Sequence, residues 1–153
     1  KTRVNDYEEF LGQTLGEALL EPTRIYVKPV MEMLDSGIDL KAMVHITSGG
    51  FCNLNRVECD NIRFVIDTLQ PVPEIFNLIQ DRGGVSEAEM FEVFNMGTGF
   101  CLVVEGTNEV EAVTKICKNN DLSCQLIGQV EGCQGKEVSL PQKQLTGKGS
   151  RFT

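Results

Sequence analysis

Short β-rich runs alternate with apolar-periodic runs along this chain, and glycine or proline stands at most of the borders between them. KAMVHI (41–46) and NIRFVID (61–67) are short, β-rich and bounded by turn residues, which predicts two strands. PVPEIFNLIQDRGG (71–84) spaces its apolar residues for a helix ending at Gly83, and SEAEMFEVF (86–94) opens a second helix with a capping box. This interleaving predicts an α+β or mixed α/β fold, in which helices cover a mixed sheet.

The segment before the first of these strands carries a β-rich run followed by a helical pattern. RIYV (24–27) predicts a short strand. Pro29 suits the first turn of a helix near residues 29–36, because a backbone N–H is not needed there. Gly37 follows as a left-handed cap that ends this helix.

The second half of the chain reads as a further alternation of strand and helix. GFCLVVEG (99–106), NEVEAVTKICKNND (108–121) and SCQLIGQV (123–130) predict a β-α-β unit whose helix buries one apolar stripe. EVSL (137–140) predicts a last strand at the edge of the sheet.

The length of 153 residues matches a single domain with one core, 1–153. We divide it into a lead-in (1–11), a core (12–140) and a tail (141–153) that reads as a solvated end. The net charge of -8 opposes nucleic acid as a partner. No apolar run reaches the roughly 20 residues of a membrane-spanning helix, and no signal peptide is recognisable, so we expect a cytoplasmic protein.

The six cysteines contain no CxxC pair, which argues against a zinc site. Cys101, Cys117 and Cys124 fall inside apolar or periodic segments, where a reduced thiol packs as a small hydrophobic side chain. We therefore expect reduced cysteines and no bound metal, with disulfides as the alternative.

The strongest candidate site is the stretch HITSGGF, in which a strand runs into Thr47, Ser48, Gly49 and Gly50. Glycines let a ligand approach the backbone closely and adopt positive φ, so free N–H groups here suit a phosphate or carboxylate. A plain turn between two elements is the alternative.

Other polar residues flank predicted strands. His45 alternates with apolar neighbours on its strand, so it faces away from the core, either as scaffold or as a catalytic or ligand-polarising group. In FNMGTGF (94–100), Asn95 and Gly97 stand where a helix gives way to a strand. They suit a tight crossover or a second polar wall of a binding cleft.

Six stretches together carry a resemblance to a known family: LLEPTRIYVKPV, HITSGGF, NLNRV, PVPEIFNLIQ, GGVSEAEMFEVFNMGTGF and IGQV. In this order and spacing, over about residues 12–131, the chain resembles the C-terminal domain of phosphoribosylformylglycinamidine cyclo-ligase, also called aminoimidazole ribonucleotide synthetase. Four other enzymes share the architecture but have different sequence motifs at the glycine bend: selenophosphate synthetase, the hydrogenase-maturation dehydratase, thiamine monophosphate kinase and the amidotransferase-linked synthetase. The resemblance implies an α+β domain of the aminoimidazole ribonucleotide synthetase type.

The resemblance also implies an activity and its site. The family closes the imidazole ring of aminoimidazole ribonucleotide from formylglycinamidine ribonucleotide, using ATP and magnesium held mainly by an N-terminal half. That half has no counterpart in this chain, so we expect it to be a partner of this chain. The complete enzyme is expected to be a homodimer. We expect no turnover by this chain alone. The family's phosphate-binding glycine turn corresponds here to Thr47, Ser48, Gly49 and Gly50, with His45 beside it. A second wall of the binding cleft corresponds to Asn95 and Gly97.

The family usually has glycine at the position of Ser48. The added Cβ puts in doubt a close contact between the backbone at this position and a ligand. The alternatives are a non-catalytic binding or interaction module of the same fold, and a sister ATP-dependent enzyme of the superfamily.

Overall fold

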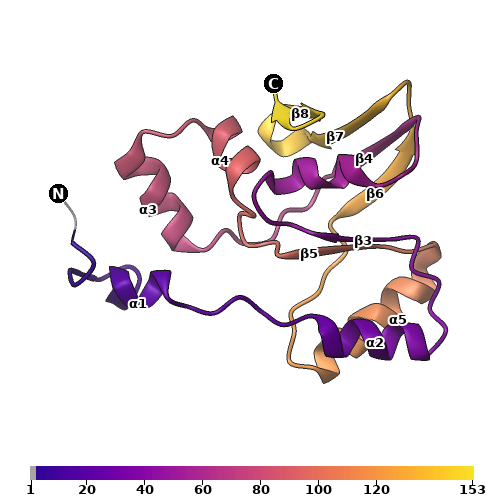
Figure 1. Cartoon of the computed structure of the whole chain (residues 1–153), viewed down its shortest axis with the longest axis horizontal. Helices are drawn as coiled ribbons and strands as arrows, with labels where there is room; N and C mark the ends of the chain where they lie inside the picture. Colours follow the sequence, from indigo (N-terminus) through magenta and orange to yellow (C-terminus); the bar gives the residue numbers. More distant parts are fainter. Residues whose placement is uncertain (1–2) are drawn as a thin grey trace.

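The computed structural model describes residues 3–153, in which helices and short strands alternate along the chain (Figure 1). The strands are β1 (Tyr7–Glu8), β2 (Gln13–Thr14), β3 (Ala42–His45), β4 (Ile62–Ile66), β5 (Phe100–Val103), β6 (Gly128–Gly132), β7 (Lys136–Leu140), β8 (Leu145–Lys148) and β9 (Arg151–Phe152). The helices are α1 (Leu15–Leu19), α2 (Val27–Asp35), α3 (Glu74–Gly83), α4 (Glu87–Val93) and α5 (Gly106–Asn119), with 3-10 turns η1 (Gly50–Arg56) and η2 (Pro141–Lys143).

The strands form three separate sheets in the described part of the chain. A five-stranded sheet has the order β6-β4-β7-β8-β9, in which β4 lies parallel to β7 and antiparallel to β6. β3 and β5 form an antiparallel ribbon that sets Val44 opposite Cys101 and His45 opposite Phe100. β1 and β2 form a small hairpin. The predicted mixed sheet is therefore confirmed, although it does not include every strand.

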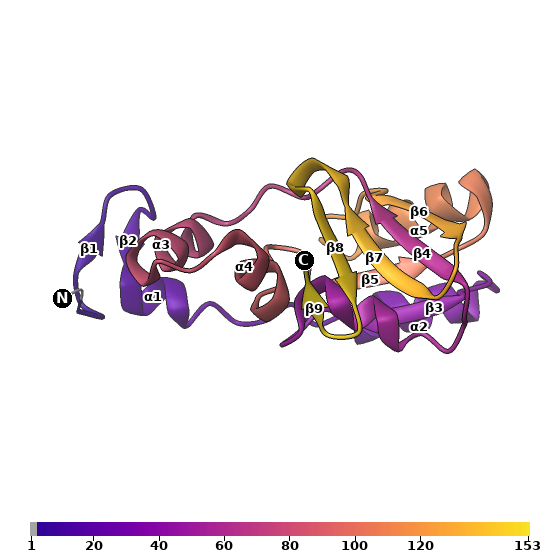
Figure 2. The same cartoon turned by 90° about the horizontal axis from the view of Figure 1, so that it is seen from above.

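Helices cover these sheets on different sides. Figure 2 shows the molecule as elongated, with the β1–β2 hairpin, α1 and α3 at one end and the larger sheet at the other. The hairpin is tied to α3 by an ion pair in which Arg82 donates two hydrogen bonds to Glu8, at 2.7 and 2.8 Å. α2 and α5 pack together beside the β3–β5 ribbon (Figure 1).

The main core lies between η1, α4 and the five-stranded sheet. Its fully buried side chains include Phe51 and Leu54 of η1, Met90 and Phe91 of α4, and Val138 of β7. A smaller core between α2 and α5 buries Met33, Val113 and Cys117. No helix within residues 3–153 is long and apolar enough to cross a membrane.

Several predicted elements are confirmed within a residue or two. The strands predicted at 41–46 and 61–67 are β3 and β4, and Gly37 ends α2 with φ at +77°. α3 continues through Gly83, and Gly84 rather than Gly83 adopts the left-handed conformation. At the start of α4, the Ser86 hydroxyl accepts a hydrogen bond from the Glu89 N–H, which is one half of the predicted capping box.

One predicted strand and one predicted β-α-β unit are wrong. Residues 24–26 form no strand, and α2 begins at Val27, because this run has no neighbouring strand to pair with. The predicted β-α-β unit also does not form, since β5 pairs with β3 while β6 pairs with β4 in another sheet.

The end of the chain belongs to the sheet. β7 was predicted as a last edge strand, but it lies between β4 and β8, and its Val138 and Leu140 are fully buried. The interpretation of residues 141–153 as a solvated end is wrong, because β8 and β9 extend the sheet and Phe152 is only 5% exposed. The prediction rested on the basic residues of this segment and gave no weight to its apolar positions, such as Phe152.

Candidate anion-binding site at the glycine bend

The glycine bend, residues Thr47 to Gly50, is a tight turn between β3 and η1. The Gly50 N–H donates to the Thr47 carbonyl at 2.9 Å, and the Ile46 N–H donates to the Gly99 carbonyl just before the turn. Gly49 has φ of +104° and Gly50 has φ of +49°, conformations that residues with a Cβ rarely adopt. Both glycines are therefore required by the path of the backbone.

Gly50 serves packing and does not offer a free amide. It is buried, and a Cβ built on it would lie 1.8 Å from the carbonyl oxygen of Phe91 in α4. Its N–H is already used within the turn. The expectation that Gly50 contributes an amide to a bound anion is therefore wrong, and its absent side chain instead lets α4 approach the bend.

The remaining amides of the bend are available. Within residues 3–153, no protein acceptor is found for the N–H of Ser48 or of Gly49. Ser48 is exposed and, unlike the two glycines after it, has no positive φ. A side chain at position 48 is thus accommodated without backbone strain, and its hydroxyl adds a hydrogen-bonding group.

A small cavity of about 290 Å³ opens in front of the bend. Its polar lining consists of His45, Thr47, Asn53 and Arg56, and its apolar lining of Met43, Val44 and Val57. Asn53 is only 2% exposed, and its amide nitrogen lies 3.4 Å from the His45 carbonyl and 3.5 Å from the Thr47 carbonyl. Asn53 therefore fixes the strand end that carries the bend.

Arg56 brings a positive charge to this cavity. One guanidinium nitrogen lies 3.6 Å from the position that a Cβ of Gly49 would occupy. None of the ion pairs found in residues 3–153 involves Arg56, so its charge is not neutralised by a carboxylate there. An anion in the cavity would meet this guanidinium, and the amides of Ser48 and Gly49 lie in the adjoining turn.

Sequence reasoning missed Asn53 and Arg56, although a signal was present. They stand three and six residues after Gly50, and in a 3-10 turn residues three apart lie above one another on one face. A 3-10 turn starting at the glycines would therefore have predicted that both side chains return toward the bend.

His45 lines the cavity, and its outward direction is the one that alternation along the strand predicted. It is exposed, whereas its neighbours Val44 and Ile46 are buried. Its ring centroid lies 5.9 Å from that of Tyr26 and 6.0 Å from that of Phe100. The rings of Tyr26 and Phe100 stack at 5.0 Å, and partial burial raises the pKa of the Tyr26 phenol. Scaffold contacts thus orient the imidazole next to the cavity.

Tyr26 joins three stretches that are far apart in the sequence. A Cβ on Gly99 would lie 2.1 Å from the Tyr26 hydroxyl oxygen, so this glycine makes room for the phenol. PTRIYV, HITSGGF and FNMGTGF consequently meet at Tyr26, His45 and Gly99.

Asn95 and Gly97 do not reach the small cavity. The Asn95 side-chain oxygen accepts a hydrogen bond from the Gly97 N–H at 3.0 Å, which closes the turn into β5. Gly97 has φ of +94°, and a Cβ on it would lie 2.7 Å from Pro73. Neither residue lines the cavity at the bend, so the structure does not bring this predicted second wall to the predicted phosphate cradle.

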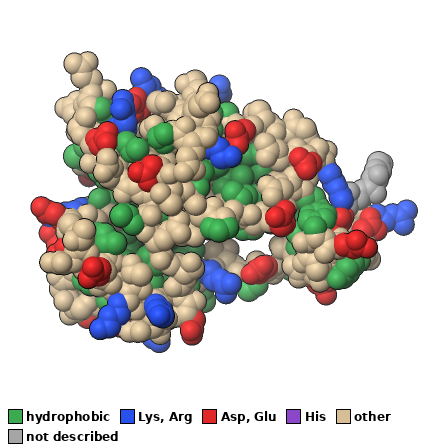
Figure 3. Space-filling model, turned by 180° about the vertical axis from the view of Figure 1, so that it is seen from behind, with side chains coloured by type: hydrophobic (Ala, Val, Ile, Leu, Met, Phe, Trp, Pro, Cys, Tyr) green, Lys and Arg blue, Asp and Glu red, His purple; other side chains and the backbone are tan. Residues whose placement is uncertain are grey.

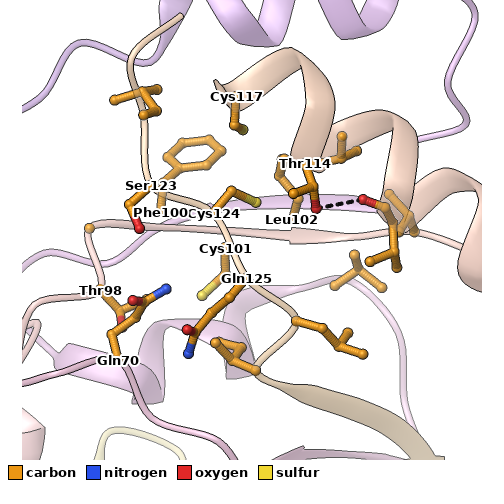
Figure 4. A pocket seen from close by; sticks show the side chains of 18 of the residues that line it. Gln70, Thr98, Phe100, Cys101, Leu102, Thr114, Cys117, Ser123, Cys124 and Gln125 are labelled. Carbon is orange, nitrogen blue, oxygen red and sulfur yellow. Dashed lines mark hydrogen bonds between the residues drawn. The ribbon is translucent and has the colours of Figure 1, made fainter. Parts of the chain in front are cut away.

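A larger, mostly apolar cavity of about 500 Å³ lies between α5, β5 and the segment that leads into β6 (Figure 4). Gly97 and Thr98 line it, and Thr98 is only 7% exposed. Three thiols, Cys101, Cys117 and Cys124, lie on its walls. This cavity is separate in its lining residues from the one at the bend.

The fold and the bend define an α+β domain that offers a cation and free amides beside a glycine turn. Residues 2–141 match the family described as AIR synthase related protein, C-terminal domain, and the chain belongs to this family.

Named relatives fit the same conclusion. A phosphoribosylformylglycinamidine cyclo-ligase of Methanocaldococcus jannaschii is 45% identical over 132 residues, which are 85% of this chain and 37% of the relative. The Bacillus licheniformis cyclo-ligase is 46% identical over 123 residues, 79% of this chain and 35% of the relative. The chain thus spans little more than a third of the length of these relatives, and it fits a C-terminal domain of that enzyme.

Proposed function

We propose that this chain is the C-terminal part of a phosphoribosylformylglycinamidine cyclo-ligase, which converts formylglycinamidine ribonucleotide to aminoimidazole ribonucleotide with ATP. The amide oxygen that must leave the substrate is a poor leaving group, and phosphoryl transfer from ATP makes it a good one. A neighbouring nitrogen then closes the five-membered ring, and ADP and phosphate are released. Positioning and charge stabilisation supply most of the rate in such a reaction.

The observation that carries this proposal is the cavity at the glycine bend. His45, Thr47, Asn53 and Arg56 line a space of about 290 Å³, and the unpaired amides of Ser48 and Gly49 belong to the turn that follows Thr47. Charge-assisted hydrogen bonds from a guanidinium and backbone amides suit the oxygens of a phosphate. In the proposed role, this site holds a phosphate group of the substrate, and His45 beside it contacts the reacting part of the ligand.

The rest of the enzyme is the proposed partner. ATP and magnesium are assigned mainly to an N-terminal half, and the complete enzyme is proposed to be a homodimer. Large apolar side chains support such contacts, since Leu20, Ile25 and Val27 are 82%, 78% and 68% exposed. The back of the molecule likewise shows apolar surface between charged side chains (Figure 3).

A non-catalytic module of the same fold is the alternative in which Ser48 marks a site that has lost its function. Ser48 sits in an ordinary backbone conformation, and the two residues that require glycine are glycines. The cyclo-ligase function is therefore better supported than a non-catalytic module, and the substrate test below addresses a sister enzyme.

The test is reconstitution from two parts. This chain is mixed with an N-terminal half taken from a cyclo-ligase relative, and ADP release is measured with and without formylglycinamidine ribonucleotide. Substrate-dependent release by the pair, and none by either part alone, is the expected result. A soluble, associated pair that releases no ADP would contradict the proposal, and release with a different substrate would favour a sister enzyme.

A further inference from the structure

Cys117 and Cys124 lie next to each other although neither has a place in the proposed reaction. Cys117 belongs to the last turns of α5, and Cys124 follows in the segment that leads to β6. Both line the larger cavity, and Cys124 packs against the small core that contains Cys117 (Figure 4). Both thiols therefore belong to one cavity wall and one small core.

The backbone between them is folded to bring this about. The N–H groups of Asn120 and Leu122 both donate to the Cys117 carbonyl at 3.0 Å. Asp121, between them, adopts a positive φ of 56°, which reverses the chain. A specific local turn at the end of α5 therefore brings Cys124 back against the small core that contains Cys117.

We propose that Cys117 and Cys124 are a modification site, at which a disulfide forms reversibly when the protein meets an oxidised thiol such as glutathione disulfide. All six cysteines are free in this structure, so the reduced state is the starting point. The product would close a short loop that links the end of α5 to the wall of the cavity.

The exchange proceeds in two balanced steps. The Cys124 thiolate attacks one sulfur of glutathione disulfide, and one glutathione thiolate leaves as a mixed disulfide forms. The Cys117 thiolate then attacks the Cys124 sulfur and expels the second glutathione. Two electrons pass to glutathione, whose two thiolates take up the two protons from the protein thiols.

Exposure decides the order of these steps. Cys124 is half-buried and reaches solvent, whereas Cys117 is 7% exposed. Burial, with the Cys124 thiol beside it, raises the pKa of Cys117 to about 12, so it is a poor first nucleophile. Once a mixed disulfide sits next to Cys117, proximity favours the second step.

Cys101 is the competing partner in the same cavity. It belongs to β5 and packs in the main core, and burial alone raises its pKa to about 12. Cys117 and Cys124 instead share the smaller core between α2 and α5, so they are the favoured pair.

The experiment uses the whole 153-residue chain. It is incubated with glutathione disulfide at mildly alkaline pH, and the remaining thiols are alkylated in denaturant. Trypsin cuts after Lys115, Lys118 and Lys136, and cleavage at Glu131 separates Cys124 from Cys133. Mass spectrometry should then find peptide 116–118 joined to peptide 119–131, with the loss of two hydrogen atoms.

Matched variants and a stability measurement complete the test. Cys124→Ser should abolish the joined peptides, while Cys133→Ser should leave them unchanged. The oxidised protein should melt about 5 °C above the reduced one, and a reductant should reverse the shift. A cross-link to Cys101, or glutathione retained on Cys124 while Cys117 stays open to alkylation, would overturn the proposal.

Discussion

Replacing Arg56 with glutamine tests the cavity at the glycine bend most directly. The change removes the positive charge that lies next to Gly49 and keeps a polar side chain of similar reach. Arg56 is exposed and takes part in none of the ion pairs of residues 3–153, so the fold does not depend on its charge. We therefore expect the melting temperature to stay within about 2 °C of the parent.

The expected loss of affinity follows from Coulomb's law. Opposite unit charges about 4 Å apart attract by about 1 kcal/mol in water and about 4 kcal/mol near a protein surface. Because Arg56 is exposed, its contribution lies toward the lower value, about 1–2 kcal/mol. Phosphate binding should thus weaken roughly 5- to 30-fold in Arg56→Gln.

The chain offers its own reporter for this measurement. His45 is the only histidine and lines the same cavity, so the two carbon-bound protons of its imidazole give assignable proton NMR signals that inorganic phosphate should shift. Lys118→Gln, in the last turn of α5, removes the same charge outside the cavity and is the control. Equal phosphate affinity in Arg56→Gln and the parent, or an equal loss in Lys118→Gln, would refute a specific role for Arg56.

Three further substitutions test the fold. Gly50→Ala places a Cβ 1.8 Å from the Phe91 carbonyl oxygen and should lower the free energy of unfolding by more than about 3 kcal/mol in urea denaturation; a loss under about 1 kcal/mol would disprove that packing. Phe152→Ala should cost about 3 kcal/mol by the same measurement, whereas a solvated tail would lose almost nothing. The Arg63 guanidinium hydrogen-bonds Glu137 and holds the pKa of that carboxyl below its ordinary value of 4.5. The unfolded chain thus takes up this proton first, and stability due to Glu137 is present above about pH 4.5 and lost as pH falls through the lowered pKa. Melting temperatures between neutral and acidic pH should fall less in Glu137→Gln than in the parent, and parallel curves would contradict this.

The candidate site was only partly readable from the sequence. The pattern around HITSGGF located the turn and the outward face of His45, because strand alternation and adjacent glycines are local signals. The pattern could not show that Gly49 and Gly50 have different roles, because Gly50 is required by the close approach of Phe91, which belongs to a helix some forty positions away. Nor could it show that Asn95 turns back to hold Gly97 instead of lining the cavity.

The sequence alone indicated the family to which the chain belongs. Local patterns in it also predicted the strands β3 and β4, the glycine ends of α2 and α3, and the exposed face of His45. These features depend on neighbours within a turn or a strand, which the sequence displays directly. Tertiary structure alone decided which strands pair, that residues 145–152 complete a sheet, that Arg56 lies beside the glycine bend, and that Tyr26 packs against His45. Such long-range contacts are selected by burial and packing of the whole chain, and no local pattern records them.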